Sequence, residues 1–269
     1  MQHREYQVSE ELRNVIACCW HTTKGMPGQK SSFEVQPDGY AEIIFYFGSS
    51  CSILQNGRLL DLPSPFLVGL LDKPAVFHTE GQLEIIGIRC YPWSVFDLLG
   101  LPANKANVHR FEHPIANLQV ALNIFVQSGR LDEAFESLHQ YLLQLDNADP
   151  DAMLSKAGDF LRERKGRIPV SQLAASAHAS VRTLERKFKR SAGHTVKDVS
   201  ALVRFEQVRN ELWHNPGVNL AGLAHEVGYT DQAHLSREFK RYSGSSPRAF
   251  AKAARSNKNA LDFVAFIQA

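Results

Sequence analysis

The spacing of apolar and polar residues in the 269-residue chain predicts strands first and helices later. Between about residues 33 and 91, short apolar runs are separated by turn sequences. QPDG precedes AEIIFYFG, QNGR lies between SIL and LLDL, and EGQ joins AVFHT to LEIIGIRC. Closely spaced strands with tight turns are typical of a sandwich or small barrel. We therefore predict a strand-rich N-terminal domain.

After Tyr91 the apolar spacing becomes helical. PWSVFDLLG predicts a short helix that begins at Pro92 and ends at Gly100, and PIANLQVALNIFVQSG and LDEAFESLHQYLLQL predict two longer ones. The last of these has an i, i+3, i+4 stripe that belongs either to the core or to a dimer contact. We expect a homodimer through residues 115–145. The stripe consists of Leu131, Ala134, Phe135, Leu138, Tyr141, Leu142 and Leu145.

A polar segment, DNADPDA (146–152), follows these helices and contains a proline. Everything beyond it has helical spacing. We therefore predict a first domain over residues 1–149, a helical domain over residues 150–256 and a C-terminal tail over residues 257–269.

The helical domain contains an internal repeat. VSQLAASAHASVRTLERKFKRSAG (170–193) and NLAGLAHEVGYTDQAHLSREFKRYSG (219–244) share Leu-Ala, a short helix, a polar turn and then Leu-x-x-x-Phe-Lys-Arg-x-x-Gly. Leu173 matches Leu223 at an offset of fifty, and Phe188 matches Phe239 at fifty-one. The extra residue falls in the turn, where loops absorb insertions. Between the copies, residues 195–213 predict one long helix that Asn215-Pro216-Gly217 ends.

Each copy has the length pattern of a helix-turn-helix, whose second helix enters the DNA major groove. In the second copy Gly228 supplies the turn, because a positive φ costs glycine little, and Asp231 is placed to cap the following helix. His234 projects toward neither the groove face nor a metal partner, so we expect it to be structural.

Helical projection places cations opposite the core residues of both second helices. Opposite Leu184 and Phe188 lie Arg182, Arg186 and Lys189, flanked by Glu185. Opposite Leu235 and Phe239 lie Ala233, Arg237 and Lys240, with Ser236 beside them. A single arginine on a helix is most often only solvated, but the duplicated pattern favours nucleic-acid contact. Arginine on such a face reads guanine, whereas cations nearer the helix ends contact phosphate. The expected phosphate contacts are Lys189, Arg190, Lys240 and Arg241.

The charge distribution agrees with this interpretation. Residues 1–149 hold 10 basic and 17 acidic residues, a net charge of −7, whereas residues 150–269 hold 20 and 11, a net charge of +9. A basic half joined to an acidic half suggests a polyanion-binding module coupled to something else. A protein-interaction module is the alternative, and it predicts no salt-dependent DNA binding.

The segment AHEVGYTDQAHLSREFKRYSGSSPRAF resembles the second helix-turn-helix of AraC-type transcription regulators. It combines a Gly-aromatic turn (Gly228-Tyr229), Phe239-Lys240-Arg241 and a Gly-x-x-Pro close (Gly244 to Pro247). The resemblance covers about residues 153–255. It implies two three-helix subdomains joined by the long helix, with both recognition helices in successive major grooves. By position, the implied base-reading residues are Arg182, Glu185, Arg186, Gln232, Ala233, Ser236 and Arg237. At Ala233 the sequence departs from the family, in which a longer polar side chain is common, so Arg237 should dominate the second half-site.

The acidic half more weakly resembles the sensor domains of a subgroup in which a cupin-like barrel is followed by helices. The implied fold class is α+β: a cupin-like β-barrel or sandwich with trailing helices, then an all-α double helix-turn-helix domain. The implied partners are double-stranded DNA, RNA polymerase and a small-molecule effector, with no cofactor. No residue identifies the effector, and the direction of regulation stays open.

Two enzyme classes are the alternatives to a DNA-binding regulator. A metal-dependent cupin needs two histidines one residue apart, and no such HxH pair occurs among His78, His109 and His113, so no metal site is expected. An alkyl-transferring repair protein needs an activated thiolate. Cys18, Cys19, Cys51 and Cys90 show no ligand spacing, although His21 is near Cys19. The N-terminus has no apolar leader and no long apolar run follows, so we expect a soluble cytoplasmic protein without membrane contact.

Overall fold

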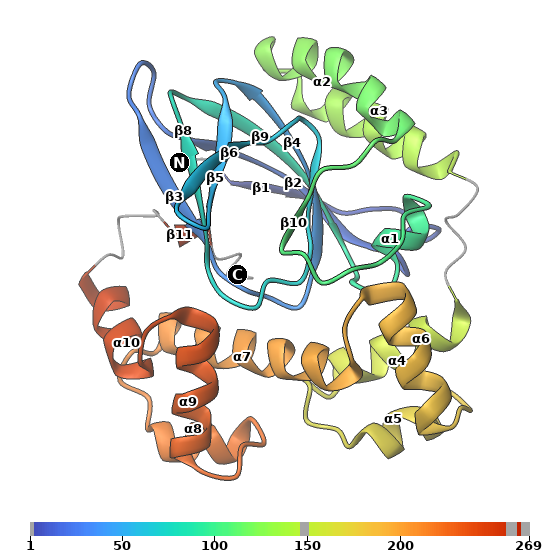
Figure 1. The fold of residues 1–269 in the computed structure, drawn as a ribbon, viewed down its shortest axis with the longest axis vertical. Helices are drawn as coiled ribbons and strands as arrows, with labels where there is room; N and C mark the ends of the chain where they lie inside the picture. The colour runs from blue at the N-terminus through green and yellow to red at the C-terminus, as the bar shows by residue number, and fades with distance from the viewer. Residues whose placement is uncertain (1–2, 146–150, 257–262, 265–269) are drawn as a thin grey trace.

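The computed structural model describes residues 3–145, 151–256 and 263–264. A strand-rich N-terminal part lies above a helical C-terminal part in Figure 1, which confirms the predicted α+β class. The strands are β1 (Arg4–Tyr6), β2 (Ile16–Lys24), β3 (Ser31–Val35), β4 (Ala41–Gly48), β5 (Cys51–Gln55), β6 (Arg58–Asp61), β7 (Phe66–Val68), β8 (Ala75–Thr79), β9 (Leu83–Cys90), β10 (Val108–His109) and β11 (Phe263–Val264). The helices are α1 (Val95–Leu98), the 3-10 turn η1 (Pro114–Asn117), α2 (Leu118–Gln127), α3 (Leu131–Leu143), α4 (Ala152–Glu163), α5 (Val170–Ser176), α6 (Val181–Ala192), α7 (Val196–His214), α8 (Leu220–Glu226), α9 (Gln232–Ser243) and α10 (Pro247–Ser256).

The strands form two sheets, which together make up the barrel of the N-terminal part. One has the order β1-β2-β9-β4-β7-β10 and the other β11-β3-β8-β5-β6. Asn56 and Gly57 both have positive φ and close the β5–β6 hairpin that QNGR predicts. The EGQ turn, in contrast, joins no hairpin, because β8 and β9 belong to different sheets. It carries the chain from one sheet to the other.

The sequence interpretation missed β2, which lies between β1 and β9 in the larger sheet. Seven of its nine residues are buried, so both of its faces are covered. Such a strand shows no alternation of apolar and polar residues. The period-2 signal that revealed the later strands is therefore absent there.

The N-terminal part has two hydrophobic cores. One lies between the sheets and includes Trp20, Ile44, Phe66 and Phe77. The other lies between the outer face of the larger sheet and the helices α2 and α3 (Figure 1). The α3 stripe belongs to this second core, since four of its members are buried: Ala134, Phe135, Leu138 and Leu142.

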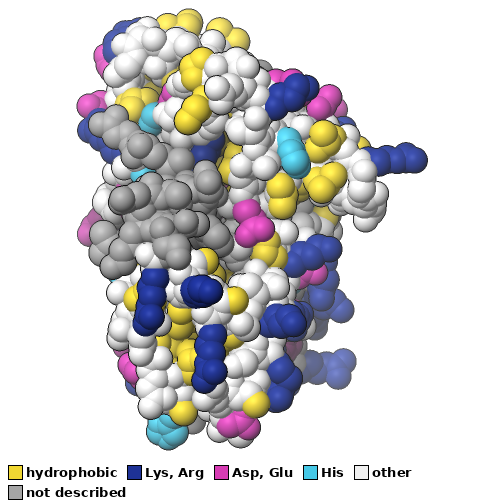
Figure 2. Space-filling view, turned by 90° about the vertical axis from the view of Figure 1, so that its left-hand side faces the viewer, with side chains coloured by type: hydrophobic (Ala, Val, Ile, Leu, Met, Phe, Trp, Pro, Cys, Tyr) yellow, Lys and Arg dark blue, Asp and Glu magenta, His cyan; other side chains and the backbone are white. Residues whose placement is uncertain are grey.

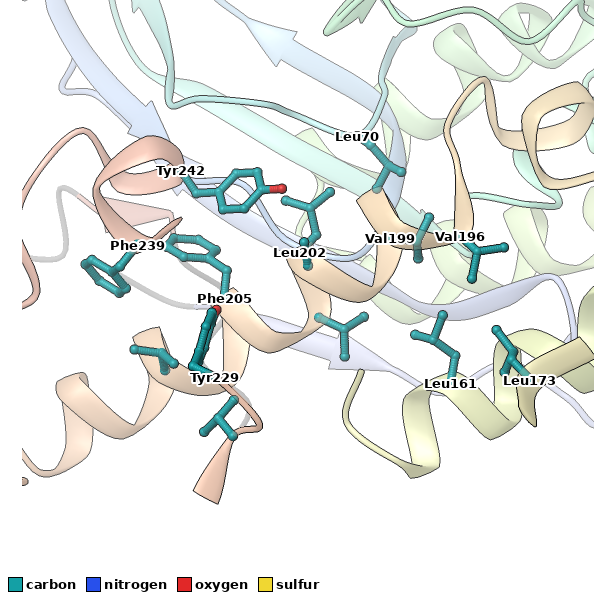
Figure 3. Close-up of a cluster of buried hydrophobic side chains, with 14 of the residues drawn as sticks. Leu70, Leu161, Leu173, Val196, Val199, Leu202, Phe205, Tyr229, Phe239 and Tyr242 are labelled. Atoms are coloured by element: carbon teal, nitrogen blue, oxygen red, sulfur yellow. The ribbon is translucent and has the colours of Figure 1, made fainter. Parts of the chain in front are cut away.

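In the C-terminal part, α7 links the three helices α4 to α6 with the three helices α8 to α10, as predicted (Figure 1). Its apolar residues contact both groups, and Figure 3 shows Val199, Leu202 and Phe205 within this core. Leu70 and Trp93 of the N-terminal part join the same core. The two parts therefore share buried surface. The predicted boundary at residue 150 lies outside the described residues, as does the predicted tail apart from β11.

Candidate nucleic-acid interface

The two predicted helix-turn-helix units are α5–α6 and α8–α9. Gly228 has a φ of 81° in the second turn, as the sequence predicts. His178 is the equivalent residue of the first turn, fifty positions earlier, and has a φ of 51°. Histidine is among the non-glycine residues that tolerate this conformation. The two turns therefore have the same backbone geometry despite their different residues.

Equivalent caps fix both recognition helices. The side chain of Asp231 accepts a hydrogen bond from the His234 amide at 2.7 Å, so its predicted capping role is confirmed. Ser180 accepts from the Thr183 amide at 3.1 Å in the first unit. These contacts satisfy amides that a helix leaves free at its start. The helices α6 and α9 therefore begin at equivalent points of the repeat.

Most of the predicted base-reading side chains are accessible. Arg182, Arg186, Ala233 and Arg237 are exposed, and Gln232 and Ser236 are half-buried. Glu185 differs, because its carboxylate accepts a hydrogen bond from the Val196 amide at the start of α7, at 3.2 Å. The predicted phosphate contacts are all exposed: Lys189, Arg190, Lys240 and Arg241.

Tyr229, the aromatic residue of the second turn, is buried with 5% exposure. Its hydroxyl donates to Glu238 at 2.6 Å, and Glu238 also pairs with Arg204 of α7 at 3.5 Å. Burial, followed by the neighbouring Glu238 carboxylate, raises the pKa of this tyrosine. The His234 ring lies edge-on to Tyr229 at 5.2 Å, in the structural role expected for it. Tyr229 thus fixes the second unit against α7.

The sequence interpretation missed a basic row on α10, formed by Arg248, Lys252 and Arg255. Their spacing of four and then three residues places them on one helical face, which was a signal available in the sequence. Figure 2 shows Lys and Arg side chains gathered over the lower part of the face that carries these C-terminal helices. The basic surface of this half is therefore wider than the two recognition helices.

Polar groups also join the C-terminal half to the barrel. Arg209 of α7 donates to the carbonyl oxygen of Pro37 at 2.9 Å and is 1% exposed. Arg162 of α4 donates to the Tyr40 hydroxyl and stacks over its ring. The adjoining Gly39 leaves space for α7, since an added Cβ would lie 3.0 Å from Val203. The turn before β4 is therefore seated against α4 and α7.

The barrel holds a small cavity between its sheets, with a volume of about 30 Å³. A water molecule needs roughly 10–15 Å³ on this measure, so the cavity has room for about two. Its lining is apolar apart from a few groups, of which Glu42 is the acidic one. Glu42 accepts from Arg89 at 2.8 Å, and Arg89 also pairs with Asp38 at 3.2 Å. This carboxylate therefore lies between the cavity and the turn that contacts α7.

The cysteines of the N-terminal part are buried free thiols. Within residues 3–145, 151–256 and 263–264, no three His, Cys, Asp or Glu side chains converge to hold a metal ion. Burial raises the pKa of Cys18 and that of Cys51 to about 12, so these thiols stay protonated at neutral pH. His21 pairs with Glu84 at 2.8 Å. Among these described residues, none of the helices combines the length and the apolar composition that a membrane span requires.

Two capped helix-turn-helix units on one connecting helix define the C-terminal half as a double helix-turn-helix DNA-binding domain. Residues 173–253 match the helix-turn-helix domain family, and residues 4–112 match a domain of unknown function. A putative AraC-like transcription regulator of Streptomyces antibioticus is 31% identical over 137 residues, which cover 51% of this chain and 44% of that protein. The regulator VirS of Mycobacterium tuberculosis is 30% identical over 180 residues, which cover 57% of this chain and 52% of that protein. The ToxT structure from Vibrio cholerae has a TM-score of 0.47 at 10% sequence identity, and the match covers 87% of this chain and 98% of ToxT.

The helix-turn-helix match and the AraC-like relative support, for the C-terminal half, the resemblance to AraC-type regulators found in the sequence. Both of these relatives are named as transcription regulators. The chain spans about half the length of the curated relatives that it matches.

Proposed function

We propose that this protein is a sequence-specific regulator of transcription that binds double-stranded DNA through α6 and α9. The observation that carries the proposal is the duplicated, identically capped helix-turn-helix with exposed cations on both second helices. A helix presented in this way fits the major groove, and two such helices joined by the connecting helix α7 fit successive major grooves. Such a regulator works in the cytoplasm, where bacterial DNA lies, and contacts RNA polymerase there.

Base reading falls mainly to Arg182 and Arg186 in the first unit and to Arg237 in the second, with Gln232 and Ser236 beside it. Ala233 offers only a methyl group, which suits contact with the methyl of thymine. Glu185 must release the Val196 amide before it reaches a base, so we expect it to contribute less. Lys189, Arg190, Lys240 and Arg241 contact phosphate.

The experiment that tests this function is a DNA titration at several salt concentrations. Fragments selected from a random pool by the purified protein would be compared with scrambled fragments by fluorescence anisotropy. Because each phosphate contact releases counterions, affinity should fall steeply between about 50 and 200 mM salt. The selected fragments should bind more tightly than the scrambled fragments at every salt concentration. Binding without sequence preference, or none at low salt, would show that the domain has another role.

For the N-terminal half we propose an effector-responsive sensor over residues 1–149, joined to a DNA-binding domain over residues 150–256 and a short tail. The route to the DNA-binding half runs from Glu42 at the cavity through Arg89 and Asp38 to the turn that Arg209 contacts. An effector shifts the equilibrium only if it binds one arrangement of the two halves more tightly. Since the cavity has room for about two waters, binding of a larger effector would have to enlarge it.

We further propose a homodimer through residues 115–145. On α2, Val120 and Ile124 lie one turn apart with exposures of 71% and 54%, while α3 uses its apolar stripe for the core. The second copy would cover this pair. Sedimentation should show a dimer for the wild type and a monomer for Ile124→Glu, with Gln127→Glu as a control that adds the same charge on the same helix. A monomeric wild type, with and without DNA, would refute the dimer.

A further inference from the structure

The basic row of α10 is accessible along its length. Arg248, Lys252 and Arg255 are exposed, whereas Phe250 and Ala254 on the same helix are buried. Within the described part of the chain, Arg248 and Arg255 form no ion pair. Both guanidinium groups are exposed, so a partner in solution can reach them.

These three cations line one side of a cleft of about 410 Å³. The other side is formed by the α7–α8 turn and the first residues of α8 and α9, including Asn219, Leu220 and Gln232. Gly217 of the turn brings the backbone close to Arg255, since an added Cβ would lie 3.2 Å from its Nη2 atom. No Asp or Glu is among the lining residues. Among the residues that the structure describes, the cleft is thus a concave surface with three positive side chains and no negative one.

The position of the cleft indicates which anion it takes. Gln232, the first residue of α9, lines it and is also a proposed base-reading residue. When α9 occupies the major groove, the sugar-phosphate strand that borders the groove passes beside the start of that helix. Pockets of this size that bind small molecules are mostly apolar, whereas three of the twelve described residues that line this cleft are cationic. The chemistry suits a backbone phosphate.

We propose that the α10 cleft binds the phosphates of the DNA strand flanking the base pairs that α9 reads. This inference rests on the proposed DNA-binding function and adds a third basic element to α6 and α9. Because phosphate contacts carry no sequence information, the cleft raises affinity for every sequence and fixes the register of α9 on the duplex.

The test uses the full chain with Arg248, Lys252 and Arg255 changed to alanine, singly and together. Each loss should make the slope of log K against log salt shallower by about 0.9, equally for selected and scrambled DNA. Arg58→Ala and Lys73→Ala remove exposed cations of the barrel half and should leave the slope unchanged. Circular dichroism would establish that every variant is folded. Wild-type slopes in the triple variant would overturn the proposal.

DNA carrying neutral methylphosphonates identifies the phosphates involved. Substitution next to the α9 half-site should weaken the wild type but have little further effect on the triple variant. If both proteins weaken equally, the phosphates have another partner and the proposal fails. Stoichiometric binding of inorganic phosphate at constant ionic strength, abolished in the triple variant without any change in DNA affinity, would make the cleft a free-anion site instead. If the proposed DNA-binding function were itself wrong, the result would differ from these outcomes, because the wild type would show no salt-dependent binding to DNA.

Discussion

Arg209 Nη1 lies 2.9 Å from the carbonyl oxygen of Pro37, and this hydrogen bond joins the helix that connects the two DNA-binding units to the edge of the barrel. The arginine is 1% exposed, so water offers neither group an alternative partner. A buried hydrogen bond of a charged group contributes more than a neutral surface one. The contact therefore holds the DNA-binding half in one orientation relative to the barrel.

Arg209→Ala should lower the free energy of unfolding by about 1.5 to 3 kcal/mol, because it removes a charged partner from a buried carbonyl. We also expect calorimetry to resolve two unfolding transitions in place of one, since the two halves lose a shared contact. Arg204→Ala is the matched control on the same helix. Arg204 contacts Gly166 and Glu238, both within the DNA-binding half. A single transition in Arg209→Ala with an unchanged midpoint would contradict the coupling.

Glu206, one turn before Arg209, should make stability depend on pH. It is 4% exposed, and burial raises its pKa, as does Asp38, while Arg209, Arg162 and Arg89 act in the opposite direction. The folded protein then holds this proton more tightly than the unfolded chain. The stabilisation is complete below the unfolded value of about 4.5 and is lost as the pH rises through the folded pKa.

The glutamine of Glu206→Gln cannot ionise, so this variant should lack the pH-dependent part of the stability. Between acidic and neutral pH, the melting temperature of the variant should therefore increase relative to that of the wild type as the pH rises. Glu163→Gln, an exposed carboxyl of α4, serves as the control and should follow the wild type. A constant difference between Glu206→Gln and the wild type at every pH would mean that the carboxyl does not titrate in this way.

The turn glycine of the second unit should be more sensitive than a helical glycine six residues earlier. Gly228 has a φ of 81°, so Gly228→Ala should cost about 1 to 2 kcal/mol for the left-handed backbone. Gly222 lies within α8 with no atom within 4 Å of an added Cβ, so Gly222→Ala should gain about 0.5 to 1 kcal/mol from helix propensity. Urea unfolding would show whether each substitution lowers or raises the free energy of unfolding. A loss of stability at Gly222 equal to that at Gly228 would contradict this account of the turn.

The sequence was sufficient for the helical half because its signals are local. The cap at Asp231 depends on residues within one turn, and the repeat of Leu173 at Leu223 is a match between two short segments, each of which is local. The positive φ of His178 was also deducible, since the repeat aligns it with Gly228, but a histidine gives no turn signal by itself. Local chemistry thus identified the elements that carry the proposed interface.

The contacts between the halves were beyond local reasoning. Arg209 and Pro37 are 172 positions apart, and a polar residue on a helix ordinarily indicates solvent. The helix α7 is buried on most of its surface, so its pattern lacks the polar face that would show which residues contact the barrel. Equally, β2 was missed because the larger sheet is covered on both faces. Only the assembled structure shows these pairings.

Arg237 and Lys240 should separate sequence reading from general affinity. Both are exposed on α9, the arginine nearer the middle of the helix and the lysine in its last turn. Arg237→Ala should cost about 1 to 3 kcal/mol on the selected sequence and little on scrambled DNA, because a bidentate contact to guanine is lost. Lys240→Ala should weaken all sequences alike and reduce the salt slope by about one. Anisotropy titrations of both variants against selected and scrambled duplexes provide the comparison. If the two substitutions changed every sequence equally, Arg237 would be a phosphate contact, and base reading in the second half-site would have to depend on Gln232 or Ser236.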